Sequence, residues 1–489
     1  MSSHPDSPKP RLSRLAASLA LLCNGAAVAA AGVMPDPEAA GVAAASERAA
    51  AYEDVLAKLQ SLGTIAPAPQ GTTHVVMNCN DHGADSLRDA IASASSGDTI
   101  DLTTLACTKI TLTTGDIVIA HDTLVINGPG AGNLTIDGDF NAGHNNRIFT
   151  HAGVGTLSVK GLTLTDTKYI GTTFAGGGCI LSSGTVIVDS STLTGCEVMS
   201  QGNGTAFGGA VSANKGLFLV HSKVTGNFAV SPSAALALGG GVDAYGGLHV
   251  EYSTVADNIA GGSANSRGGG VHTSNGSVYM LGSTVSGNAA TFEGGMQITD
   301  YTGPHAIRII NSTISENYAS IEVGGLGLAA PATIANSTIA FNHAHGSFYG
   351  TGLQFLNAQG PALTLQSTLI ANNYNDNGEA SDSAIATGAV LTGANNLITS
   401  HLGPIPAGTI TLCPKIGPLG NQGGPTQTHR LLLGSPAIDA GNDVGGAPYD
   451  QRGIGFPRTH GTQTDIGAFE DQGVTPNVIF IGGFEGRCR

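Results

Sequence analysis

A six-residue unit, Ser-Thr-apolar-x-x-Asn, recurs through the middle of the chain at intervals of 25 to 31 residues. Lysine replaces the threonine in the second copy, and Cys196 replaces the asparagine in the first. A repeat of this kind indicates a solenoid of stacked units rather than one globular core. The copies begin at Ser191, Ser222, Ser253, Ser283, Ser312, Ser337 and Ser367, and the asparagines are Asn227, Asn258, Asn288, Asn317, Asn342 and Asn372.

Each unit follows a short stretch in which apolar residues alternate with others, as at Val186 and Val188 or Leu248 and Val250. A period of two indicates a strand with one buried face. Four-stranded propeller blades of ~40–50 residues are longer than these units. The pattern therefore predicts a right-handed single-stranded parallel β-helix. We expect the asparagines to stack at corners, to hydrogen-bond along the axis and to tolerate left-handed backbone there.

The ends of a solenoid expose unpaired strand edges, so they require caps. The stretch 85–94 predicts an N-terminal capping helix with Asp85 as its N-cap. Leu87, Ala90, Ile91 and Ala94 would share one face of that helix and cover the first coil.

The first 31 residues have the pattern of an export signal. Lys9, Arg11 and Arg14 precede a short apolar stretch, which ends in the small residues 26–31. No later segment offers ~18 consecutive apolar residues, so we expect no membrane span in the mature chain. A helix is expected around 38–62, before a proline-rich linker. We therefore expect a secreted protein, extracellular or at the bacterial cell surface or outer membrane.

The charge balance excludes two classes of partner. The chain has 20 Lys and Arg against 35 Asp and Glu, for a formal net charge of -15. Nucleic-acid affinity depends mainly on basic contacts to phosphate, and anionic membrane surfaces also attract basic segments. We expect neither partner, and we expect a monomer.

Six cysteines follow the signal, and an even number in an exported chain suggests disulfides. Cys196 stands at an asparagine corner, close to where Cys179 and Ala210 would stack in neighbouring coils. We therefore predict a Cys179–Cys196 bond. Cys79 and Cys107 flank the capping helix and are predicted to pair. The pairing of Cys413 and Cys488 stays open.

Three stretches resemble parts of bacterial surface β-helix proteins. Asp85-Ser-Leu-Arg-Asp-Ala-Ile with Gly97-Asp-Thr-Ile resembles the CSLREA-type N-terminal module. The repeats resemble those of polymorphic outer membrane proteins. The segments from Gly423, Gly434, Asp450 and Asp465 are similar to the choice-of-anchor domain. The resemblance implies a secreted or surface-exposed protein without an assigned activity.

One outward column of the repeats is a candidate binding surface. Coils stack ~4.8 Å apart, so Phe218, His249, Tyr279 and Arg308 would form an exposed stripe. Such a stripe could bind a glycan or a surface protein, or its rings could stack only for stability.

Enzymatic chemistry is the alternative, because many β-helices are polysaccharide lyases or glycoside hydrolases. Asp137 and Asp139 are the nearest carboxylate pair, but Asp-Gly-Asp is more typical of a turn. We assign no catalytic residue, cofactor or metal, and expect a non-enzymatic adhesion or binding role. The expected parts are a signal peptide (1–31), a helical segment with linker (32–73), a cap with the first coils (74–175), repeats (176–412), a choice-of-anchor-like cap (413–471) and a tail (472–489).

Overall fold

The computed structural model describes residues 71–473 apart from positions 203, 233–234, 263, 301–304, 346–349, 357–361, 380 and 444–445. The described residues belong to the unit Gln60–Arg489. The expected signal peptide, the expected helix around 38–62, Cys488 and nearly all of the expected tail lie outside them.

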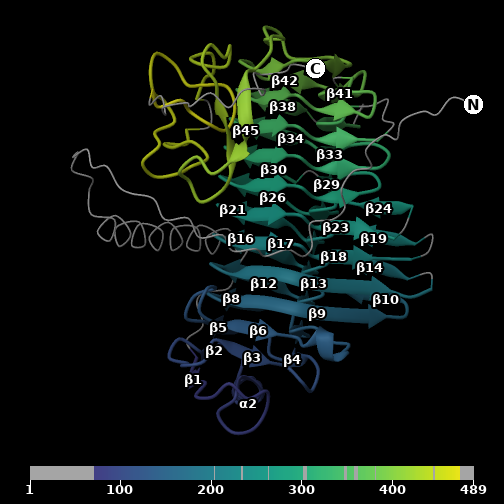
Figure 1. Ribbon diagram of the computed structural model, residues 1–489, viewed down its shortest axis with the longest axis vertical. Helices are drawn as coiled ribbons and strands as arrows, with labels where there is room; N and C mark the ends of the chain where they lie inside the picture. The colour runs from purple at the N-terminus through teal and green to yellow at the C-terminus, as the bar shows by residue number, and fades with distance from the viewer. Residues whose placement is uncertain are drawn as a thin grey trace, which may run out of the picture. The chain divides into compact units, whose positions relative to one another are not determined.

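The described chain is a parallel β-helix, as the repeat predicted (Figure 1). Each coil contributes one strand to each of three long parallel sheets, here called A, B and C. Alternate side chains point inward in every sheet, so the strands' buried valines, leucines and isoleucines merge into one continuous core. The strands of sheet A are β1 (Thr73–Val75), β2 (Asp98–Asp101), β5 (Leu124–Asn127), β8 (Thr156–Lys160), β12 (Thr185–Asp189), β16 (Gly216–Val220), β21 (Leu248–Glu251), β26 (Val278–Leu281), β30 (Ile307–Ile310), β34 (Ala332–Ala335), β38 (Leu363–Gln366) and β42 (Leu391–Thr392).

Sheet B follows sheet A in each coil, and in most coils a corner divides it into two short strands. In β9 and β13 the strand runs unbroken through this corner. The first row is β3 (Lys109–Thr111), β6 (Thr135–Asp137), β9 (Thr163–Gly171), β13 (Thr192–Ser200), β17 (Lys223–Thr225), β22 (Thr254–Ala256), β27 (Thr284–Ser286), β31 (Thr313–Ser315), β35 (Thr338–Ala340), β39 (Leu369–Ala371) and β43 (Leu397–Ile398). The second row is β18 (Phe228–Val230), β23 (Ile259–Gly261), β28 (Ala289–Ala290), β32 (Tyr318–Ala319), β36 (His343–Ala344) and β40 (Tyr374–Asn375).

Sheet C completes each coil, and four coils place an extra strand before it, which together form the small parallel sheet D. The strands of sheet C are β4 (Ile117–Ile119), β7 (Phe149–His151), β11 (Ile180–Ser182), β15 (Val211–Ala213), β20 (Val242–Ala244), β25 (Val271–Thr273), β29 (Met296–Thr299), β33 (Leu326–Ala329), β37 (Leu353–Phe355), β41 (Ser383–Ile385) and β44 (His401–Leu402). Those of sheet D are β10 (Phe174–Gly176), β14 (Thr205–Phe207), β19 (Leu236–Leu238) and β24 (Asn265–Arg267).

The repeated asparagines form the expected ladder. The side-chain nitrogen of Asn227 donates to the side-chain oxygen of Asn258 at 2.9 Å, and the same 2.9 Å bond joins each following pair. These side chains are fully buried, so the ladder satisfies amides that would otherwise be costly to desolvate. The repeated serines form a second ladder, in which each backbone N–H donates to the next serine hydroxyl.

Two details of the expected corners are wrong. The left-handed residue is the one before each ladder asparagine, for example Asp257 or Glu316, so the asparagine itself is not left-handed. In the last repeat the ladder member is Asn373, whereas Asn372 takes the left-handed position. The register there shifts by one residue, and the hydroxyl of Thr368 makes the bonds expected of Ser367.

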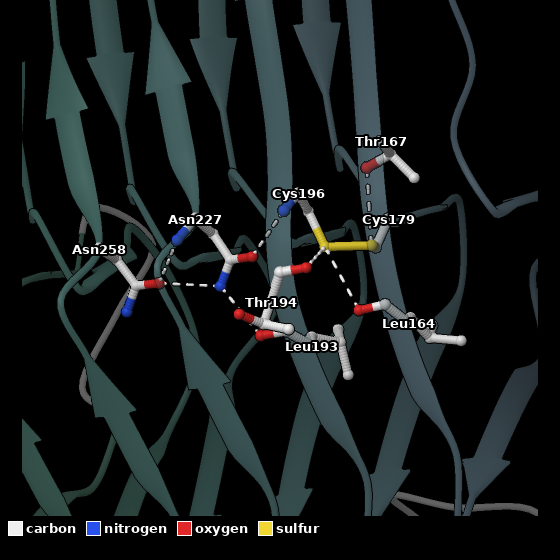
Figure 2. The surroundings of a disulfide bond; sticks show 8 residues. All are labelled: Leu164, Thr167, Cys179, Leu193, Thr194, Cys196, Asn227 and Asn258. Atoms are coloured by element: carbon white, nitrogen blue, oxygen red, sulfur yellow. Dashed lines mark hydrogen bonds between the residues drawn. A yellow bond between two sulfur atoms is a disulfide. The ribbon is translucent and has the colours of Figure 1, made fainter. Parts of the chain in front are cut away.

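The predicted cysteine pairs lie at disulfide positions. Cys179 and Cys196 are bonded with their Cα atoms 5.4 Å apart, and Cys79 and Cys107 with theirs 6.4 Å apart. Figure 2 shows that Cys196 occupies the asparagine position, with its N–H donating to Asn227. Cys413 is also disulfide-bonded.

The α-helix of the described chain, α2 (Leu87–Ser93), begins after Ser86, whose hydroxyl accepts from the N–H of Asp89. Ser86 is therefore the N-cap, and the expectation of Asp85 is wrong, because Asp85 adopts a left-handed conformation just before it. The predicted face of Leu87, Ala90 and Ile91 is buried in the core. That the helix acts as an end cap stays a prediction. One 3-10 turn, η1 (Phe140–Ala142), lies farther along the chain.

The C-terminal segment after residue 413 packs against the outer face of sheet B. It contains the antiparallel pair β45 (Ile416–Gly420) and β46 (Thr428–Leu431), drawn in yellow-green in Figure 1. The Gln451 amide bonds the hydroxyls of Thr284 and Thr313, and the N–H of Ala468 donates to the hydroxyl of Thr338. No helix in the described part of the chain is long and apolar enough to cross a membrane.

Candidate functional site: a groove on sheet C

Sheet C carries a column of residues, all but one of them polar, at the middle, outward position of six consecutive strands. Residues on both sides of this position, such as Val242 and Ala244, point into the core and are fully buried. The column follows from the parallel register, which aligns residues of equal position in successive coils. Its members are Ser212, Asp243, His272, Gln297, Gly327 and Gln354.

The last five members of this column line a groove of about 680 Å³. Sheet D contributes one wall through Phe207, Leu236 and Leu238. The other side includes Tyr245 and Leu356, which are 55% and 58% exposed. The groove spans the coils from β14 to β37, so it crosses several strands along the axis of the solenoid. Its lining combines exposed apolar surface with convergent polar groups, as ligand sites do.

Asp243 and His272 form a close pair in the groove. The ring nitrogen Nδ1 of His272 lies 2.6 Å from a carboxylate oxygen of Asp243. The hydroxyl of Ser212, one coil earlier, donates to the other oxygen at 3.4 Å. A carboxylate in this position orients the imidazole and favours one tautomer, which leaves Nε2 for contact with a ligand.

Glu293 is the most deeply buried acid of the groove, at 3% exposure. One carboxylate oxygen lies 3.1 Å from Nη1 of Arg267 and accepts from the amide of Gln297 at 3.3 Å. Burial raises the pKa of Glu293 to about 7, although Arg267 opposes that rise. Desolvation dominates because the carboxylate is enclosed, whereas the Arg267 side chain is 33% exposed and shares its charge with water.

Gly327 makes room for this carboxylate. A Cβ atom at position 327 would stand 2.7 Å from Cγ of Glu293, well inside van der Waals contact. Every other groove member of the column has a polar side chain, so the glycine leaves a gap that Glu293 fills.

The buried amide of Gln354 has an oxygen without a hydrogen-bond partner among the described residues. The side chain is 2% exposed and lines the groove. Buried polar atoms are normally paired, so an unpaired acceptor here points to a ligand or water that completes it.

The predicted stripe on sheet A is aligned as expected but is not uniformly exposed. Phe218, His249, Tyr279 and Arg308 follow one another in register, and the rings of His249 and Tyr279 stack 5.1 Å apart. Phe218 and His249 are only 6% and 8% exposed, so the expectation of an exposed stripe is wrong for them. Their rings pack on each other, and His249 also pairs with Glu251 at 2.9 Å. Ligand binding by the stripe stays a prediction.

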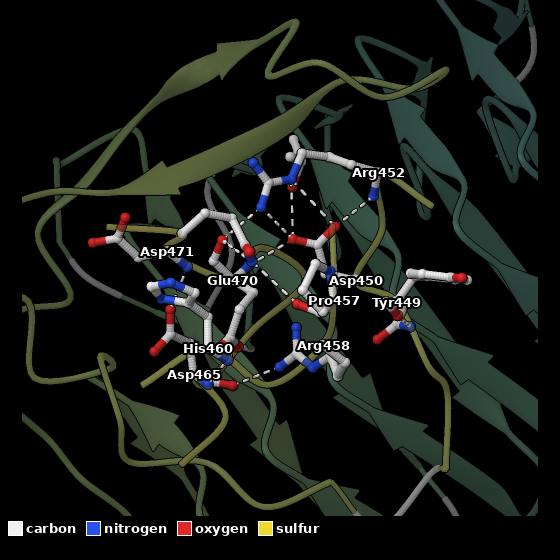
Figure 3. A network of polar contacts seen from close by, with 12 residues as sticks. Tyr449, Asp450, Arg452, Pro457, Arg458, His460, Asp465, Glu470 and Asp471 are labelled. Carbon is white, nitrogen blue, oxygen red and sulfur yellow. Dashed lines mark hydrogen bonds and ion pairs between the residues drawn. The ribbon is translucent and has the colours of Figure 1, made fainter. Parts of the chain in front are cut away.

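Two other polar clusters have structural roles. Asp137 accepts from the N–H of Asp139, which is left-handed, so Asp-Gly-Asp forms a turn. In the C-terminal segment, Arg452 pairs with Asp450 (Figure 3). The Arg452 guanidinium also lies over the rings of Phe456 and Phe469. Nearby, Glu470 accepts two backbone N–H groups. Among the described residues no group of His, Cys, Asp or Glu is arranged to hold a metal ion.

The groove residues are not among those predicted from the sequence, although a signal for them is present. Glycine followed by an apolar and then a polar residue recurs as Gly241-Val-Asp, Gly270-Val-His, Gly295-Met-Gln and Gly352-Leu-Gln. The last residue of each triplet is a member of the sheet C column.

Comparisons with known proteins identify no family for this chain. No family model matches it, and no curated protein matches it. Among solved structures, it is similar to the crystal structure of pectate lyase Pel9A, with a TM-score of 0.46 and 15% identity over 82% of this chain and 96% of that chain. That likeness is too distant to bear on function.

Proposed function

We propose that this protein is an exported β-helix that binds a polysaccharide in the groove of sheet C. The observation that carries the proposal is the combination of exposed apolar side chains with a column of hydrogen-bonding groups. Sugar rings offer an apolar C–H face and several hydroxyls. Tyr245 and Leu356 suit the first, and Asp243, Gln297 and Gln354 suit the second.

The direction of the groove supports an extended ligand. Its lining residues recur coil after coil at ~4.8 Å, so a polymer that lies along the solenoid meets similar groups at each step. The disulfides support export, because such bonds persist mainly outside the cytosol.

Cleavage of the bound glycan is a second candidate function. It is favoured by a carboxylate–imidazole pair and a carboxyl group of raised pKa in one groove. Such a set could supply a base and an acid, the two roles that glycoside hydrolysis requires.

The experiment is a panel of neutral and acidic polysaccharides tested for binding and for product release. Tyr245→Ala should weaken binding at least about tenfold, because the exposed ring can be removed without loss of core packing. Tyr279→Ala on sheet A is the matched control and should leave binding unchanged. Loss with Tyr279→Ala alone would move the site to the stripe. Binding of no polysaccharide would overturn the proposal.

A further inference from the structure

Arg267 is held at the edge of the groove by two contacts. Its guanidinium carbon lies 4.2 Å from the centre of the Phe292 ring, and its Nη1 contacts both carboxylate oxygens of Glu293, at 3.1 and 3.4 Å. No partner among the described residues bonds its Nη2 or Nε. The ring supports one face of the guanidinium, so a planar row of donors is fixed in place and partly exposed.

Arg267 also stands out by charge. Asp243, Arg267, His272 and Glu293 are the ionisable side chains of Asp, Glu, Lys, Arg or His that line the groove, and Arg267 is the one permanent cation among them. Asp243 is engaged with His272, so Glu293 is the group that balances the guanidinium.

We propose that Arg267 and Glu293 form an oxyanion subsite of the groove, which takes the carboxylate or sulfate group of an acidic polysaccharide when Glu293 is protonated. This inference rests on the proposed function, because it names the class of glycan that the groove holds. A planar guanidinium can bind either oxyanion through two parallel hydrogen bonds.

Protonation matters because an ionised Glu293 would compete for Arg267 and repel the incoming anion. The groups that face Glu293 are Arg267, His272 and Glu322, together with the Gln297 amide. Glu322 disfavours the ionised form of Glu293, whereas Arg267 and His272 favour it, and burial outweighs them. Protonation near neutral pH leaves the guanidinium without its internal counter-ion, while the Phe292 ring still supports it.

Anion binding and proton uptake are therefore linked. A ligand that binds only the protonated form, with a pKa of about 7, should bind roughly 30-fold more tightly at pH 5.5 than at pH 8.5. Neutral polysaccharides should show no such dependence on Glu293.

The test uses the full chain and three probes: polygalacturonate for carboxylate, dextran sulfate for sulfate, and unsubstituted dextran as the neutral probe. Dissociation constants are measured at pH 5.5 and 8.5 at constant ionic strength. Glu293→Gln should bind an acidic probe about equally well at both pH values. Arg267→Gln should lose at least tenfold for that probe at pH 5.5, and Arg267→Lys should recover part of the loss.

Arg308→Gln on sheet A is the matched control, since it removes an exposed arginine outside the groove and should leave the dissociation constants unchanged. The acidic probe that responds identifies the anion. Thermal unfolding of each variant verifies that it is folded. An acidic probe that depends on Tyr245 but not on Arg267, or binding of dextran but of neither acidic probe, would overturn the subsite and leave the groove proposal standing. Binding that depends on neither Tyr245 nor Arg267 would overturn both the subsite and the groove proposal.

Discussion

The backbone N–H of Cys196 donates to the side-chain oxygen of Asn227 at 3.0 Å, so a cysteine occupies the first position of the asparagine ladder. Its sulfur bonds Cys179 across a separation of 17 residues. The ladder therefore begins in a covalent link and continues through buried amides for several coils.

Replacing this disulfide in two ways should separate its covalent contribution to stability from the contribution of residue 196 to the ladder. Cys179→Ala with Cys196→Ala removes a bond worth roughly 3 kcal/mol and keeps the backbone N–H that donates to Asn227. Cys179→Ala with Cys196→Asn should recover about 1–2 kcal/mol, because asparagine can donate to the carbonyl of Leu164, which Cys196 faces. Urea unfolding under non-reducing conditions measures the free energy of unfolding of both variants. Equal stability of the two would contradict the ladder assignment.

Asn288 should contribute more to the stability of the fold than the burial of its small side chain alone would. Its amide donates to Val255 and Asn317, and its oxygen accepts from both the N–H and the amide of Asn258. Asn288→Ala should cost on the order of 3 kcal/mol, because the buried partners lose their bonds. Asn275→Ala is the control, since Asn275 is buried but its oxygen has no partner among the described residues. A smaller loss at Asn288 than at Asn275 would argue against the ladder.

Asp382 closes the ladder and should make stability depend on pH. It accepts both the N–H and the amide of Asn373 at 2.9 Å, and burial raises its pKa to about 6 from 3.8. Because the folded pKa is above the unfolded one, the fold favours the protonated acid. Stability from this group is fully present below pH 3.8 and is lost as pH rises through about 6, by roughly 3 kcal/mol.

Asp382→Asn should therefore be more stable than the wild type at pH 7.5, with the difference shrinking toward pH 4. Melting temperatures across this range test the prediction. Comparing variant with wild type at each pH cancels other groups, such as His429, whose pKa burial lowers to about 4. A variant that is destabilised equally at every pH would show that the ionised carboxylate is needed.

Gly327→Ala tests how Glu293 is placed. The new methyl group would meet Cγ of Glu293 at 2.7 Å, so that side chain must move while the strand backbone stays compatible with alanine. We expect a modest loss of stability, about 1 kcal/mol, with a shift in the pH dependence of acidic-glycan binding. Gly216→Ala on sheet A is the control, because its Cβ would meet nothing closer than 3.7 Å. An unchanged pH profile for Gly327→Ala would show that Glu293 does not set it.

The repeat predicted the fold because register in a solenoid is a property of the sequence period. Equal positions of successive coils stack, so the asparagine ladder, the Cys179–Cys196 bond and the order from Phe218 to Arg308 could all be placed. In the last repeat, Asn372 was wrongly assigned to the ladder because Ser367-Thr368 matches the Ser-Thr motif one residue out of phase. Leu369 rather than Thr368 occupies the outward position there, where the C-terminal segment covers it.

The groove could not be predicted in the same way, because it forms where the outer face of sheet C meets sheet D. The polar column of sheet C becomes a site only where sheet D forms a wall, and this depends on which coils carry an extra strand. Glu293 lies outside the column, and its burial follows from the missing side chain of Gly327. The exposed fractions of the side chains in the sheet A stripe could not be predicted from the sequence either. His249 is buried because it pairs with Glu251, two residues along the same strand.

A crystal structure with a bound acidic or neutral oligosaccharide, whichever binds, tests the central claim most directly. The account predicts that the sugar rings lie across β20, β25 and β29, in contact with Tyr245 and within hydrogen-bond distance of Asp243 or Gln297. Sugar rings against Tyr279 and Arg308 on sheet A, with the groove empty, would contradict it.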